Sequence, residues 1–123
     1  MCTVSRILPV SAAACLLSFT ALAQPTMSRD QVLRVFESAI ARFQKECGFT
    51  IMQARLPGTV NCGRGAETIG TAWDRMLVQS GLPSSYKARE QIAADLKLDP
   101  STSLVLQGMA RAEGIDHLLS QLR

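Results

Sequence analysis

Cys47 and Cys62 are the residues of this chain with the clearest chemistry. The fourteen residues between them fit neither the Cys-x-x-Cys pattern of redox thiols nor the ligand spacing of zinc sites. We therefore predict one structural disulfide between Cys47 and Cys62. Two reduced thiols with a metal or redox role are the alternative.

The segment that this disulfide would enclose contains Arg55-Leu56-Pro57-Gly58. Pro-Gly favours a turn, so these four residues are expected at the exposed tip of a tethered loop. An arginine beside a leucine on a constrained loop suits insertion into a partner's cleft. The alternative is a plain connector between two helices.

A second candidate site is Gly63-Arg64-Gly65. We expect a helix to begin directly after it, so that free backbone N–H groups, the helix dipole and Arg64 could together hold a carboxylate or phosphate. The alternative is that the two glycines only release the chain from Cys62 into the helix.

Catalytic and metal-binding motifs are missing from the sequence. It contains no Gly-x-Ser-x-Gly, His-Glu-x-x-His or phosphate-binding glycine loop. The one histidine, His117, is expected on a solvent-facing helix surface, and Trp73 in the core. We predict no catalytic residue, metal or cofactor, although two carboxylates brought together by folding would leave a small hydrolase or lyase open.

The first 23 residues predict the compartment. Arg6, the apolar run over residues 7–21 and the small-residue pattern Ala21-Leu22-Ala23 are typical of an export signal. Cleavage after Ala23 would separate a signal, residues 1–23, from one domain, residues 24–123, in the periplasm or outside the cell. A retained membrane anchor and a lipid on Cys15 are the alternatives.

The remaining charge pattern is that of an ordinary soluble surface. Loss of Arg6 takes the 13 basic residues to 12, against 10 acidic ones, and both signs are scattered along the chain. No block of like charge exists, so we expect neither a nucleic-acid partner nor stable membrane insertion after cleavage.

Residues 91–102 resemble the helix-turn-helix of transcriptional repressors locally. The helix that follows nevertheless presents Leu104-Val105-Leu106 where polar groups would have to contact DNA.

Helical periodicity governs most of the domain. Ser28 and Gln31 form a capping-box pattern before a helix over residues 29–47, which Gly48 should end. Further helices are predicted over residues 66–80, with a Schellman ending at Gly81, and over residues 85–97.

The C-terminal part predicts two more helices. Asp99-Pro100 should open a helix to about residue 113, which the apolar run Leu104-Val105-Leu106 should make the most buried one. Gly114 should end it before a short terminal helix. Residues 49–65 are expected to be a loop; a hairpin of residues 50–52 with residues 59–60 is less favoured because its register would not bring Cys47 opposite Cys62. The predicted fold is an all-α bundle of four to five short helices with one disulfide-bounded loop.

These features favour a small exported protein that binds another envelope or secreted protein, in the manner of an inhibitor or immunity protein, without catalysis. The second candidate is an accessory or structural component of an envelope secretion or conjugation assembly, with the first or last helix supplying an apolar interaction stripe. The oligomeric state and the partner are not specified by the sequence.

Overall fold

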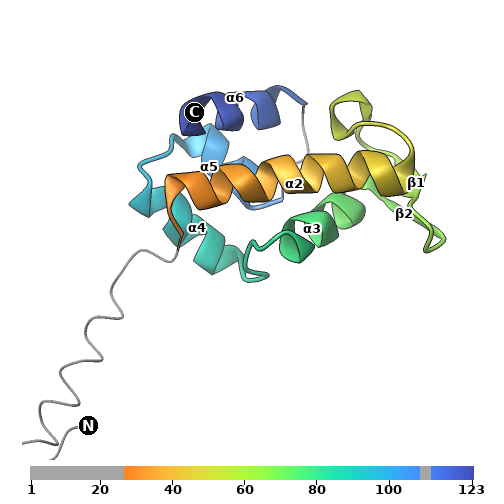
Figure 1. Cartoon of the computed structure of the whole chain (residues 1–123), viewed down its shortest axis with the longest axis horizontal. Helices are drawn as coiled ribbons and strands as arrows, with labels where there is room; N and C mark the ends of the chain where they lie inside the picture. Colours follow the sequence, from red (N-terminus) through yellow and green to blue (C-terminus); the bar gives the residue numbers. More distant parts are fainter. Residues whose placement is uncertain (1–26, 109–111) are drawn as a thin grey trace, which may run out of the picture.

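The computed structural model describes residues 27–108 and 112–123. The predicted signal, with Arg6 and Cys15, lies outside the described residues, as do Met109 and Ala110. The described residues form five α-helices, one short 3-10 helix and one two-stranded sheet (Figure 1). In chain order these are α2 (Arg29–Cys47), η2 (Ile51–Gln53), β1 (Thr59–Asn61), β2 (Ala66–Thr68), α3 (Ile69–Gln79), α4 (Tyr86–Asp95), α5 (Pro100–Leu106) and α6 (Ala112–Leu122). The prediction of a small, mostly helical bundle is confirmed, with a small hairpin added.

Helix α2 is the longest element and has the predicted bounds. The Ser28 hydroxyl accepts a hydrogen bond from the Gln31 backbone N–H, and the Gln31 side chain accepts one from the Ser28 N–H, which completes the capping box. Gly48 ends the helix in the left-handed conformation, with φ of 84°. Local signals at both ends were therefore sufficient to place this helix.

The core forms around α2, which lies between α6 and α3 (Figure 1). Trp73 is fully buried, as predicted, with its ring centroid 5.9 Å from that of Phe36 and 6.4 Å from that of Phe43. The apolar stripes of α2 and α6 are both part of this core. Both stripes are thus buried mainly within the fold, and a role of either helix in an envelope assembly stays a prediction.

The segment between α2 and α3 differs from the prediction. Thr59–Asn61 pairs antiparallel with Ala66–Thr68, so residues 49–65 are not simply a loop, and the less favoured hairpin of residues 50–52 with residues 59–60 is wrong as well. Pairing of β2 delays the start of α3 to Ile69, three residues later than predicted. The Schellman ending of α3 is confirmed, because the Leu82 N–H donates to the Leu77 carbonyl and Gly81 has φ of 119°.

Helices α5 and α6 also have other bounds than predicted. Helix α5 begins at Pro100 behind the Asp99 cap, as expected, but ends at Leu106. Gly114 lies inside α6 and does not end a helix. A Cβ atom at Gly114 would lie 2.7 Å from Val105 Cγ2, so this glycine permits the close approach of α5 and α6.

Burial on α4 and α5 differs too. Leu104 is 52% exposed, so the apolar run Leu104-Val105-Leu106 is not buried along its whole length as expected. Helix α4 ends at Asp95, before the predicted residue 97, and Arg89 on this helix is fully buried. The sequence did not predict a charged residue in the core.

Candidate functional site

Cys47 and Cys62 form the predicted disulfide, with their Cα atoms 4.1 Å apart. Cys47 is the last residue of α2, and Cys62 is buried directly after β1. The bond therefore joins the end of the longest helix to the turn of the β1–β2 hairpin, where Cys62 follows β1. The chain between the two cysteines is held at both ends.

Further contacts fix the path of the enclosed segment. Ile51 is fully buried, and Val60 is buried on β1. The Gly58 carbonyl accepts a hydrogen bond of 3.1 Å from the Ile69 N–H, at the start of α3. A Cβ atom at Gly58 would lie 2.7 Å from the Arg55 carbonyl oxygen, so only glycine fits this turn without movement of the backbone.

Between these anchors the chain is exposed. Arg55 and Pro57 are exposed, and Leu56 is 42% exposed. An exposed leucine on a segment anchored on both sides is the arrangement expected of a preorganised contact, because little chain entropy remains to be lost on binding. Arg55, Leu56 and Pro57 thus lie at the surface as predicted, whereas Gly58 has a structural role.

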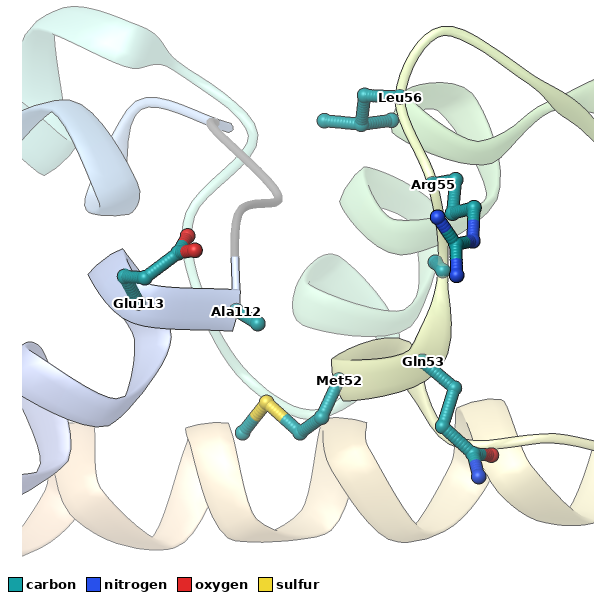
Figure 2. A pocket seen from close by; sticks show the side chains of 7 residues that line it. Met52, Gln53, Arg55, Leu56, Ala112 and Glu113 are labelled. Carbon is teal, nitrogen blue, oxygen red and sulfur yellow. The ribbon is translucent and has the colours of Figure 1, made fainter.

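One wall of a groove of about 640 Å³ is formed by this segment, and the other by the start of α6. Met52 extends along the floor toward Ala112, and Leu56 and Glu113 point into the space between the walls (Figure 2). Gln53 points away from the groove at its rim (Figure 2). The lining residues are Met52, Gln53, Ala54, Arg55, Leu56, Ala112 and Glu113.

The groove combines an apolar floor with opposite charges on its walls. Met52, Ala54 and Leu56 provide apolar surface, and methionine adapts its shape readily to a partner. Arg55 stands on one wall and Glu113 on the other, in the first turn of α6. This arrangement can bind a segment that carries both apolar and charged groups.

Sequence reasoning located only part of this groove. It identified Arg55 and Leu56, but not Met52, Ala112 or Glu113. Ala112 and Glu113 are distant in sequence from the loop and carry no motif, so no sequence signal could have joined them to it. Packing of α6 against η2 brings the two walls together.

Gly63, Arg64 and Gly65 occupy a different place from the one expected. They form the tip of the β1–β2 hairpin, where the Gly63 N–H donates to Asn61 Oδ1 at 2.9 Å. Helix α3 begins four residues after Gly65, so the helix N-terminus does not contribute to this segment. The helix-dipole basis of the predicted anion site is therefore wrong, and anion binding by Arg64 itself stays a prediction.

An ion pair that the sequence did not suggest lies behind this hairpin. Arg75 of α3 donates a hydrogen bond to Glu67 of β2, and both side chains are mostly buried. That hydrogen bond, together with the charges of Arg75 and Arg64, holds the pKa of Glu67 below its ordinary value, although burial acts in the opposite direction. The pair ties the hairpin to α3.

His117 is exposed, as predicted, but it is not isolated. Its Nε2 atom lies 2.8 Å from Asp99 Oδ2. Asp99 also accepts hydrogen bonds from the Thr102 N–H, from the hydroxyls of Thr102 and Ser101, and from the Gln121 amide. The bond to His117, followed by those from Thr102, holds the pKa of Asp99 far below its ordinary value. This network joins the start of α5 to α6.

The Asp99 network predicts a loss of stability in acid. Asp99 has a lowered pKa in the folded state. Its contribution to the free energy of unfolding is therefore complete above pH 3.8, the ordinary pKa of an aspartate, and is lost as the pH falls below that value. Urea unfolding of Asp99→Asn between pH 5 and pH 2 should show a shallower pH dependence, by up to about one proton. Asparagine is also a good helix cap, so the cap itself is retained. Asp116→Asn, an exposed residue on α6, is the control; an equal change in both variants would refute the prediction.

No group of three or more metal-binding side chains occurs in residues 27–108 and 112–123. Over the same residues, no helix is long and apolar enough to cross a membrane. The chain matches no known protein family, curated protein or solved structure.

Proposed function

We propose that this protein is a non-enzymatic exported module, periplasmic or secreted, that binds another envelope or secreted protein in the manner of an inhibitor or immunity protein. The observation that supports this proposal is the exposed Arg55-Leu56 pair on an anchored, disulfide-bounded segment beside a groove. Structural disulfides persist in oxidising compartments, which agrees with export.

The proposed contact places an apolar side chain of the partner between Met52 and Leu56. Burial of these two residues would supply the hydrophobic part of the binding free energy. Arg55 and Glu113 would orient the partner, because charges at the edge of an interface act mainly on register and specificity. The anchored segment needs little ordering on binding, so more of the interaction energy is retained.

Alanine variants of the loop test this proposal. The tagged protein is expressed in its native host, which exports it. Its partners are then captured and quantified by mass spectrometry. We expect the double variant Arg55→Ala/Leu56→Ala to recover about tenfold less of a stoichiometric partner, equivalent to about 1.4 kcal/mol. The melting temperature should change little, since both residues are exposed.

Leu104→Ala is the matched control, because Leu104 is an exposed leucine, 52% accessible, on α5. It should recover the partner as the wild type does. Equal recovery by the loop variant and the wild type would contradict binding through Arg55 and Leu56. Recovery of a large assembly that no loop substitution affects would favour the accessory-component alternative.

A further inference from the structure

A second cavity, of about 370 Å³, lies away from the groove, where the start of α3 meets the start of α4 and the end of α5. We call it the Tyr86 cavity. Tyr86 on its wall is 54% exposed, the most exposed of the large apolar or aromatic residues in the described part of the chain. Its lining residues are Thr68, Gly70, Thr71, Asp74, Tyr86 and Gly108.

Two of these residues are positioned by a buried arginine. Arg89 is fully buried, pairs with Asp74, and donates a hydrogen bond of 2.7 Å to the Pro83 carbonyl. Its guanidinium also lies over the Tyr86 ring, 5.0 Å from the centroid. Arg89 thus holds both Asp74 and Tyr86 in place, and it neutralises the Asp74 carboxylate.

The polar groups of the cavity converge. A Cβ atom at Gly108 would lie 3.6 Å from the Tyr86 hydroxyl and 3.8 Å from Asp74 Oδ1, so both groups approach the same glycine. Thr68 donates its hydroxyl hydrogen to Thr71 Oγ1 at 2.8 Å, which leaves the Thr71 hydroxyl hydrogen able to donate. Donors and acceptors therefore stand side by side next to an exposed aromatic ring.

This chemistry selects a class of ligand. Hydroxyl groups both donate and accept, so a ring bearing several hydroxyls can satisfy Thr71, Asp74 and Tyr86 together, while its apolar face covers the tyrosine ring. The Asp74–Arg89 pair carries no net charge, which favours a neutral ligand over a cation or an anion. We propose that the Tyr86 cavity binds a neutral polyhydroxylated ring, a sugar, either free or as part of a glycan chain.

Two properties of the cavity support a binding role. Its volume falls within the range of small-ligand sites, and a few polar groups on rigid helices surround it. Gly70 and Gly108 contribute no side chains, and a Cβ atom at Gly70 would meet nothing within 4 Å, so the space beside the polar groups stays open. The proposal does not depend on the groove, since the two sites share no lining residue.

Titration of the full-length protein, followed by backbone amide NMR, tests the proposal. The probes are methyl glucoside for a free sugar and a short N-acetylglucosamine oligomer for a glycan chain. Methylammonium and acetate serve as the charged comparisons. Amides of Thr71, Asp74, Tyr86 and Gly108 should shift with at least one sugar and not with either ion. Tighter binding of the oligomer would identify a glycan, and tighter binding of the glucoside a free sugar.

Variants make the test specific. Tyr86→Ala and Thr71→Val should each weaken sugar binding by about tenfold, through lost ring contact and a lost hydrogen bond. Both residues are exposed, so the variants should fold, and Leu104→Ala should bind as the wild type does. No shift with either sugar, equal shifts with the ions, or unchanged binding by both variants would overturn the proposal. The variant Arg55→Ala/Leu56→Ala should bind sugar as the wild type does, even where it no longer captures the partner. Failure of one proposal can therefore be told apart from failure of the other.

Discussion

Replacement of Asp74 with alanine is expected to lower the free energy of unfolding by about 3 kcal/mol. The substitution leaves the charge of Arg89 without its carboxylate, and Arg89 is fully buried. Breaking a buried pair typically costs about 3–5 kcal/mol, because an uncompensated charge stays in the interior. The lower end applies here, since the Asp74 side chain is 31% exposed and solvent can reach its position.

Urea unfolding at neutral pH measures this effect. Glu37→Ala is the control, because the Glu37–Arg123 pair has side chains that are 50% and 56% exposed. It should lose less than about 1 kcal/mol. The double variant Asp74→Ala/Arg89→Met should be more stable than Asp74→Ala alone, since it removes the stranded charge and keeps an apolar chain. If Asp74→Ala costs no more than Glu37→Ala, the buried pair does not stabilise the fold as argued.

Loss of the disulfide should have an effect of similar size. The double variant Cys47→Ser/Cys62→Ser should lower the free energy of unfolding by about 3 kcal/mol, the value for a closed loop of this length. The two cysteines are 15 positions apart. Each strand of the attached hairpin has only three residues, and isolated two-stranded hairpins are marginally stable. The hairpin should therefore lose order before the helical core does.

Hydrogen exchange locates this loss, and urea unfolding gives its size. Amides of residues 59–68 should lose more protection than those of α3. The comparison uses a background in which serine replaces Cys2 and Cys15, so that no other thiol can form a bond. A reducing agent should destabilise the parent and leave the double variant unchanged. Equal loss of protection in the hairpin and in α3 would contradict the expectation that the hairpin loses order before the helical core.

Most helices could be predicted because their signals are local. The Ser28–Gln31 capping box and Gly48 gave both ends of α2, and the Schellman pattern gave the end of α3. Asp99-Pro100 gave the start of α5. Each of these signals acts through backbone groups within a few residues, so the sequence around them is enough.

Elements that depend on distant partners could not be predicted in this way. Gly114 looks like a helix end, but it lies inside α6, where the absence of a side chain leaves room for Val105 of the neighbouring helix. Residues 66–68 have the composition of a helix start, yet they pair with β1. In both places a tertiary contact outweighed a weak local preference.

The residues of the candidate sites differ in the same way: some could be identified from the local sequence, and others only from the folded structure. Arg55 and Leu56 were identified from the turn residues and cysteines around them, which are features of one short segment. The opposite wall with Glu113, and the buried Arg89 that positions Asp74 and Tyr86, emerged only in the folded chain. The sequence by itself determined the disulfide, the helical class and the exposed loop, because caps, turns and cysteine spacing are local. Tertiary structure alone decided which residues face each other across a cavity, because that depends on packing between helices far apart in sequence.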